Sequence, residues 1–245
     1  MRADSKGGGG GPVRRRFVRV LLGSGAAAAG VGLLAGAQGP VSGRVAGVRK
    51  RPPDPGSAWR ELAAGNRRWR TMHEQHPDES RRVRQSLLGG QHPFAVVLGC
   101  VDSRVPPELV FDQGLGDLLT VRSAGEVLDR AVVGSIAYGV LELGIPLVVV
   151  LGHQSCGAVA AAVHAEAGGD PLPGPLRYLA EQIRPAVDPG AATDARVDAA
   201  ITTNVRRVAS RLALVPELAA RVAAGSLAVV GARYQLGSQQ VHRLT

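Results

Sequence analysis

Two short apolar runs, each ending in glycine and then in polar residues, constrain the fold of this chain most strongly. Residues 94–105 have the sequence FAVVLGCVDSRV, and residues 146–159 have the sequence PLVVVLGHQSCGAV. Runs of β-branched and aliphatic residues of this length are typical of buried parallel strands. Ligands of open α/β sheets gather just beyond the carboxyl ends of such strands. We therefore expect the polar groups that follow the two runs to meet at one edge of a sheet.

Three of these groups suit a single metal ion. Cys100, His153 and Cys156 offer two thiolates and an imidazole, a donor set that favours zinc, and catalytic zinc keeps three protein ligands and an open fourth position. His153 and Cys156 are separated by two residues, so both can reach one ion across the first turn of a helix that begins near Gly157. Backbone N–H groups at that helix start are expected to favour the thiolate form of Cys156.

Asp102 and Arg104 follow Cys100 at intervals of two residues. In an extended chain Asp102 points to the same side as Cys100 and can reach the metal or its bound water. Arg104 can then hold the Asp102 carboxylate through a bidentate pair. The alternative is a structural ion pair at the end of a strand.

The N-terminal segment predicts export. Residues 1–13 are rich in glycine, and residues 14–19, RRRFVR, match the twin-arginine export pattern. Residues 20–37 carry no charge and end in Ala-Gly-Ala, a small-residue cleavage pattern. We expect residues 1–37 to be a cleaved signal peptide, residues 38–55 a linker and residues 56–245 one globular domain. The protein would then be extracellular or in the cell envelope, with no stable membrane span; a retained transmembrane anchor is the alternative.

The basic charge of the chain does not indicate nucleic-acid binding. The net charge is +9, but residues 1–53 hold ten of the 29 Lys and Arg residues and one of the 20 acidic residues, so the remainder carries 19 of each sign. Aromatic residues make up 3% of the chain, which leaves little material for base stacking. We therefore exclude nucleic acid as a partner.

The two cysteines of an exported protein also suggest a disulfide, which is the alternative to the metal site. Each cysteine, however, has a further metal-binding group beside it at a fixed spacing. The twin-arginine route carries folded proteins, so zinc could be loaded in the reducing cytoplasm before export. We favour the metal on these grounds.

Strands and helices alternate along the globular part. The pattern predicts strands at residues 94–99, 118–122, 147–151 and 227–231. It predicts helices at 57–72 (interrupted at Gly65), from Pro77 to Gly89-Gly90, at 129–143, after the third strand to about residue 165, and at 176–187, 194–214 and 216–224. This alternation indicates an α/β fold with a mainly parallel sheet and right-handed crossovers.

The two polar motifs resemble those of the β-class carbonic anhydrases. The matching residues are Cys-Val-Asp-Ser-Arg at 100–104 and His-Gln-Ser-Cys-Gly at 153–157, and residues 116–125, GDLLTVRSAG, are similar to the segment that links these motifs in the family. Similarity runs from residue 61 to the last predicted strand. The resemblance implies a β-carbonic-anhydrase-like α/β fold in which one zinc per chain is bound by Cys100, His153 and Cys156.

The same resemblance implies roles for the surrounding residues. Asp102 and Arg104 correspond to the family's catalytic dyad, and in some members the matching aspartate is a fourth zinc ligand in a resting form. Gln91 and Tyr138 align with pocket residues of one subclass, and Gly157 corresponds to a backbone contact near the substrate. The family forms homodimers or higher oligomers whose pocket is lined by both subunits and whose N-terminal helices embrace the partner.

The chain departs from the family's pattern at four positions. Leu119 stands where many relatives have Phe, and Ser123 and Glu126 replace asparagines, which changes the pocket and not the metal site. Val97 occupies a position that is Trp in the subclass with a regulatory bicarbonate pocket, so we expect that pocket to be absent.

The expected activity is the reversible hydration of CO2 to bicarbonate and a proton by zinc-bound hydroxide, that is, a carbonate dehydratase. Two alternatives remain: a non-catalytic zinc-binding homologue with structural or interaction roles, and a hydrolase of COS or CS2 on the same scaffold. The proton-transfer residue is not identified by the sequence. The candidates are His92, His164 and Glu126. The alternative interpretation of each is an ordinary surface residue without a catalytic role.

Overall fold

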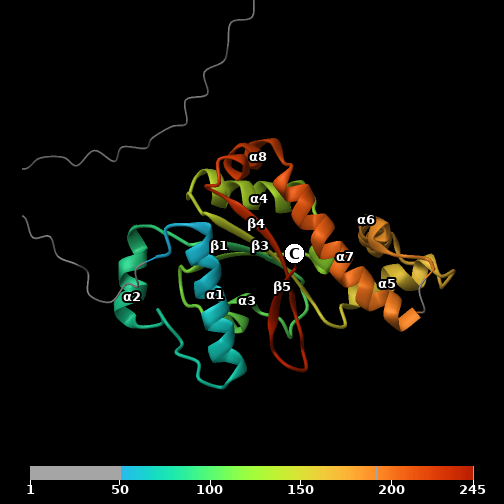
Figure 1. Ribbon diagram of the computed structural model, residues 1–245, viewed down its shortest axis with the longest axis horizontal. Coiled ribbons are helices and arrows are strands. Elements are labelled where there is room, and N and C mark those ends of the chain that lie inside the picture. Colours follow the sequence, from blue (N-terminus) through green and yellow to red (C-terminus); the bar gives the residue numbers. More distant parts are fainter. Residues whose placement is uncertain (1–50, 191–192, 245) are drawn as a thin grey trace, which may run out of the picture. The chain divides into compact units, whose positions relative to one another are not determined.

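The computed structural model of the protein describes residues 51–190 and 193–244 (Figure 1). The predicted signal peptide (residues 1–37) and residues 38–50 of the predicted linker lie outside the described residues, so both stay predictions. Among the described residues, no helix combines the length and the apolar character that crossing a membrane requires.

A five-stranded sheet organises the described chain. Its strand order is β2 (Leu118–Arg122), β1 (Ala95–Gly99), β3 (Leu147–His153), β4 (Ala228–Tyr234) and β5 (Val241–Leu244). The first four strands are parallel, and β5 is antiparallel to β4. Every residue of β1 and β3 is buried, which explains their unbroken apolar sequences. The predicted mainly parallel α/β fold is therefore confirmed.

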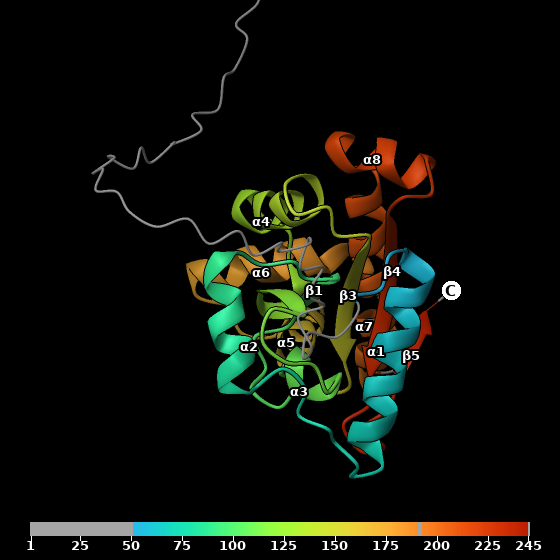
Figure 2. The ribbon, with the colours of Figure 1, turned by 90° about the vertical axis from the view of Figure 1, so that its left-hand side faces the viewer.

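Helices cover both faces of this sheet. On one face, α4 (Arg130–Leu141), α7 (Thr193–Ala213) and α8 (Pro216–Ala223) pack on alternate strand residues such as Leu98 and Val150. On the other face, α1 (Pro55–Arg70) and α3 (Pro107–Val110) pack on the intervening residues such as Val97. Figures 1 and 2 show α1 and α7 on opposite sides of β3 and β4. The period of two along each strand thus divides the apolar core into two layers.

A third apolar cluster lies beyond the carboxyl ends of the strands. It joins α5 (Gly157–Glu166), α6 (Gly174–Ile183) and the first half of α7 to Val127, Cys100 and Cys156. The remaining elements are short: α2 (Arg81–Ser86) and the 3₁₀ turns η1 (Leu87–Gly89), η2 (Ala124–Glu126) and η3 (Arg184–Ala186). The third cluster packs against the sheet end at which the two polar motifs emerge, and it includes Cys100 and Cys156.

Polar caps begin several of these helices where the sequence has short polar side chains. Asp54 accepts a hydrogen bond from the backbone N–H of Ser57, whose hydroxyl lies against Asp54 in return, so α1 starts with a capping box. Asp129 accepts from the backbone N–H of Val132 and begins α4 in the same way.

Gly65 does not interrupt the first helix, contrary to the prediction. α1 runs through it, and a Cβ added at Gly65 would lie 1.7 Å from the carbonyl oxygen of Phe111. The glycine therefore lets α1 approach the end of α3 closely, and the packing keeps the residue helical despite its low propensity.

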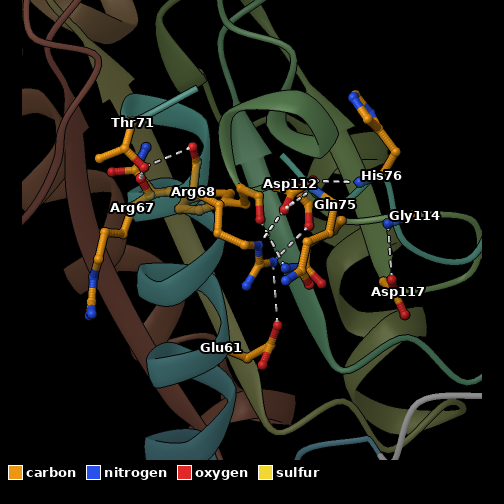
Figure 3. Close-up of polar contacts among 12 residues, drawn as sticks. Glu61, Arg67, Arg68, Thr71, Gln75, His76, Asp112, Gly114 and Asp117 are labelled. Atoms are coloured by element: carbon orange, nitrogen blue, oxygen red, sulfur yellow. Dashed lines mark hydrogen bonds and ion pairs between the residues drawn. The ribbon is translucent and has the colours of Figure 1, made fainter. Parts of the chain in front are cut away.

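The second helix begins later than predicted, at Arg81 instead of Pro77. The chain before it is held by Asp112, whose buried carboxylate accepts hydrogen bonds from the backbone N–H groups of Gln75 (3.1 Å) and His76 (3.0 Å) and from the side chain of Arg68. Figure 3 shows these groups converging on Asp112. These contacts anchor the chain just before the predicted start at Pro77. Asp78 has a left-handed φ of 56°, which keeps the residues before Ser80 out of the helix, and Ser80 is the N-cap of α2.

Three further differences concern short segments. The predicted third strand ends at Leu151, whereas β3 continues to His153, paired with Tyr234 of β4. The last predicted strand likewise continues to Tyr234 in β4. Helix α3 and the antiparallel strand β5 were not predicted; each has four residues, too few for a periodic pattern.

Candidate metal centre

The three predicted metal ligands come from two neighbouring strand ends and converge. Cys100 directly follows β1, His153 is the last residue of β3, and Cys156 is the N-cap of α5. Their ligand atoms all lie within 4.8 Å of one another, and the two sulfur atoms are 3.9 Å apart. All three residues are buried. The left-handed backbone of Ser155 (φ 55°) makes the tight turn that brings Cys156 back beside His153.

The chemistry of this group fits zinc. His153 Nδ1 is 2.9 Å from the carbonyl oxygen of Gln154, which fixes the orientation of the ring. His153 Nε2 is buried and has no hydrogen-bond partner among the described residues. A buried imidazole nitrogen without a partner, beside two thiols, is a donor set for a soft or borderline cation. Both cysteines are free thiols in the structure, which therefore does not contain the alternative disulfide between Cys100 and Cys156.

The two thiols hold one proton unequally. Hydrogen bonding from Cys156 lowers the pKa of Cys100 to about 4, and contacts with His153 and the backbone N–H of Gly125 act in the same direction. The same hydrogen bond and burial raise the pKa of Cys156. The sequence predicted that the start of α5 would favour the thiolate of Cys156. The backbone N–H of Val159 does lower the pKa of Cys156, as predicted, but the contact with Cys100 and burial outweigh this effect.

Opposing effects act on the imidazole of His153. Burial alone would lower its pKa, but the contacts with Cys100 and with the Gln154 carbonyl raise the pKa of His153 overall. The ring is thus more basic than its burial alone would allow, and its Nε2 atom faces the two sulfur atoms.

Asp102 and Arg104 form the bidentate pair that the spacing predicts. Arg104 Nε donates to Asp102 Oδ1 at 2.9 Å and Arg104 Nη2 donates to Asp102 Oδ2 at 2.7 Å. The Arg104 side chain, by these hydrogen bonds, lowers the pKa of Asp102 to about 2. Asp102 Oδ2 lies 3.8 Å from His153 Nε2, at the mouth of the metal group. The carboxylate is engaged by Arg104 and is not one of the three clustered ligands, so the resting form closed by Asp102 is not the arrangement observed.

Arg122 supports the turn that carries Cys100 and Asp102, a role that the sequence reasoning missed. Its Nε donates to the carbonyl oxygen of Cys100 and its Nη2 to that of Asp102, both at 2.7 Å. The available signal was its position: Arg122 ends a strand that lies parallel to the strand before Cys100, so its side chain reaches the same sheet edge.

The predicted pocket residues are not gathered around the ligands within one chain. Gln91 is exposed in the segment before β1, and Tyr138 is 49% exposed on α4. Tyr138 lines a groove of about 740 Å³ between β2 and α4 that also contains Leu119 and ends at Arg122. Gly157 begins α5 next to Cys156, and a Cβ added there would meet no atom within 4 Å. The site is therefore open at Gly157.

The three candidates for proton transfer differ in exposure. His92 and His164 are exposed, whereas Glu126 is 2% exposed and is not the surface residue that its alternative reading assumed. Burial, with the nearby charge of Cys100, raises the pKa of Glu126 well above its ordinary range. Of the three candidates, Glu126 is therefore the one whose side chain is buried away from solvent.

The fold and the site together define a class of protein: an α/β metalloprotein whose Cys-His-Cys group lies at the carboxyl end of a parallel sheet. The family model described as "Carbonic anhydrase" matches residues 95–241. "Carbonic anhydrase 2" of Mycobacterium tuberculosis (strain H37Rv) is 46% identical over 185 residues, which cover 75% of this chain and 89% of the relative. The "Carbonic anhydrase" of Mycolicibacterium smegmatis is 42% identical over 190 residues, which cover 77% of this chain and 92% of the relative.

Solved structures show the same likeness. The β-carbonic anhydrase CafA of Aspergillus fumigatus has a TM-score of 0.62 and 26% identity, over 76% of this chain and 90% of that one. The Coccomyxa β-carbonic anhydrase, solved in complex with acetazolamide, has a TM-score of 0.59 and 26% identity, over 65% and 75%. The chain belongs to the carbonic anhydrase family, in its β class. It is a zinc enzyme of reversible CO2 hydration, as the sequence predicted.

Proposed function

We propose that Cys100, His153 and Cys156 hold the catalytic zinc and that Asp102 orients the attacking oxygen. The observation that carries the proposal is His153 Nε2, a buried nitrogen without a hydrogen-bond partner that faces two thiols. A bound zinc ion acidifies a water molecule, so that hydroxide is available near neutral pH.

Asp102 is suited to orienting the nucleophile because it stays ionised. Its pKa of about 2 leaves the carboxylate charged over the working range, and Arg104 occupies one side of each oxygen. The remaining lone pairs can accept a hydrogen bond from the attacking oxygen and hold its own lone pair toward the carbon of CO2. A new C–O bond then forms, one C=O electron pair moves onto oxygen, and bicarbonate results. The proton lost by the water leaves through solvent or an exposed base.

The experiment is stopped-flow CO2 hydration by the purified protein across pH 6–9, with zinc measured in the same samples. We expect about one zinc per chain and a rate that rises with zinc content. Cys100→Ser and His153→Ala should both lose zinc and part of their stability. Full zinc occupancy in both variants would overturn the ligand assignment. If the zinc-replete protein does not accelerate CO2 hydration at any pH, the proposed activity is wrong. The two alternatives are then a non-catalytic homologue and a hydrolase of COS or CS2.

We further propose that two copies pair through β2 and α4, with the N-terminal helices embracing the partner, and so complete the pocket. β2 is an edge strand, and the adjacent groove is lined by the exposed side chain of Tyr138 on α4. Leu141, near the end of the same helix, is also an exposed apolar residue. Gln91 and Tyr138, as exposed residues, would then be available to a second copy's site. Leu141→Glu should reduce the molecular mass measured by light scattering, whereas Leu214→Glu, at a 77% exposed position between α7 and α8, should not. Equal masses for the two variants would argue against this surface.

We also propose export by the twin-arginine route, supported by residues 14–19 and the uncharged run after them. Replacement of Arg14 and Arg15 by Lys should trap the precursor inside the cell, measured by fractionation. Normal processing of the doubly substituted protein would exclude this route.

A further inference from the structure

We propose that Asn204 is a positioning residue of the metal centre, acting through Gly125 on Cys100. The inference rests on the zinc site proposed above. It concerns a side chain of α7 that hydrogen-bonds Gly125 and not a ligand, and that no sequence motif singled out.

The first step is a backbone hydrogen bond to sulfur. The N–H of Gly125 donates to Cys100 Sγ at 3.4 Å. Gly125 has a left-handed backbone (φ 63°, ψ 28°), and a Cβ at this position would lie 2.6 Å from Ile183 Cδ1. Only glycine satisfies both the conformation and the packing, so the turn between β2 and α4 is shaped to direct this N–H at the thiolate.

The second step holds the same glycine from the opposite side. Asn204 is 3% exposed, and its Nδ2 donates to the carbonyl oxygen of Gly125 at 2.8 Å. Asn204 also lowers the pKa of the buried carboxyl group of Glu126, the next residue of the turn. The amide from α7 therefore holds Gly125 directly in a turn where two consecutive residues, Gly125 and Glu126, have positive φ angles.

Removal of this amide would leave the Gly125 carbonyl oxygen buried without its partner. An unsatisfied buried carbonyl is costly, and a turn with two left-handed residues has lower-energy conformations to relax into. A relaxation that takes Gly125 out of the left-handed region changes both of its backbone dihedral angles, and it therefore turns the N–H away from Cys100 Sγ. Removal of the Asn204 amide thus weakens the hydrogen bond to Cys100 Sγ, although Asn204 itself does not contact Cys100.

Hydrogen bonds to a ligating sulfur tune both metal affinity and the energy of the sulfur lone pairs. Loss of an outer-shell partner typically lowers metal affinity about 10–100-fold. A thiolate that loses a hydrogen bond holds its lone pairs less tightly, so its charge-transfer absorption with a bound transition metal moves to longer wavelength.

The test compares two buried asparagines in the full chain. Asn204→Ala removes the proposed contact. Asn66→Ala is the matched control: Asn66 is 4% exposed and donates to the carbonyl oxygens of Val110 and Gln239, both at 3.0 Å and away from the ligands. Zinc affinity is measured by competition with a chelator, and Co²⁺ is substituted to record the thiolate-to-cobalt absorption. Asn204→Leu, which fills the volume, is the second variant if Asn204→Ala does not fold.

For the Asn204 variant we expect zinc affinity about 10–100-fold weaker and a cobalt band at longer wavelength, with both unchanged in Asn66→Ala. Unchanged affinity and an unchanged band in a folded Asn204 variant would overturn the inference. So would equal changes in Asn66→Ala. If neither Asn204 variant folds while Asn66→Ala does, Asn204 is required for the fold itself, and its role at the metal is rejected. Loss of zinc from the wild-type protein under the same conditions would instead reject the proposed zinc site.

Discussion

At the scale of single residues, the structure separates the Cys-His-Cys group from the pair formed by Asp102 and Arg104. Three buried ligand atoms cluster within 4.8 Å, whereas Asp102 stands beside them and is held by Arg104. The bidentate pair keeps the pKa of Asp102 near 2, so its charge does not vary in the range where the enzyme would work. A change at Asp102 should therefore alter chemistry without emptying the metal site.

Asp102→Asn should retain zinc and lower kcat/KM for CO2 hydration by about two orders of magnitude or more, the usual loss for one oriented catalytic group. The amide keeps the volume but has neither the charge nor the bidentate pairing with Arg104. Because Asp102 is ionised throughout pH 6–9, the loss should be similar at each pH. The measurement is stopped-flow hydration with zinc assayed in both proteins. Near-wild-type rates in a zinc-replete variant would show that Asp102 is only a structural partner of Arg104.

At the scale of elements, close approach decides where helices lie. α1 contacts the end of α3 at a glycine, so the helix axis lies nearer to Phe111 than a side chain would allow. α4 also contains a glycine, Gly134, whose added Cβ would meet no atom within 4 Å. The two helical glycines have the same intrinsic cost and opposite structural roles.

Gly65→Ala should lower the free energy of unfolding by about 1–3 kcal/mol, because the methyl group forces α1 away from Phe111. Gly134→Ala should instead raise it by up to about 1 kcal/mol through helix propensity. Urea unfolding of both variants at one protein concentration tests the pair. A neutral or stabilising effect of Gly65→Ala would show that the contact between α1 and α3 is not close in solution.

At the scale of the whole molecule, two carboxyl groups, Asp117 and Asp102, change the free energy of unfolding with pH in opposite directions. Burial, with the neighbouring Asp78, raises the pKa of Asp117 to about 6, while the N–H of Gly114 opposes the shift (Figure 3). A group with a raised folded-state pKa stabilises fully below its ordinary value of 3.8 and loses that contribution as pH rises through about 6. Asp102, with its lowered pKa, loses its contribution only in acid, below the range considered next.

Asp117→Asn should therefore flatten the dependence of stability on pH between 4.5 and 7. Relative to wild type, the variant should gain on the order of 2 kcal/mol over that interval, because it has no carboxylate to ionise in a buried site. The measurement is urea unfolding at several pH values, with Asp102→Asn as the control that should keep the wild-type slope in this interval. Parallel profiles for Asp117→Asn and wild type would contradict the assignment.

The sequence by itself determined the class of fold, the two central strands and the metal ligands. These are local properties: an unbroken apolar run identifies a strand buried on both faces, and parallel strands bring their carboxyl ends together. The spacing of Asp102 and Arg104 predicted their pair but not its backbone, because the expected extended chain is a turn in which the N–H of Val105 donates to the carbonyl oxygen of Asp102 and the N–H of Arg104 to Asp102 Oδ1. Residues 1–50 carry the export prediction on pattern alone.

Only the tertiary structure decided what depends on contacts between distant residues. Asp112 anchors residues 75–76 ahead of α2, Phe111 explains why Gly65 stays inside a helix, and Arg122 supports the turn of Cys100. The hydrogen bond between the two thiols lowers the pKa of Cys100 and raises that of Cys156, and it exists only because two separate strand ends meet. The link from Asn204 to Gly125 spans 79 positions of the chain. No local pattern encodes such contacts, because their energies arise only when packing has excluded water and left each buried polar group to find a partner.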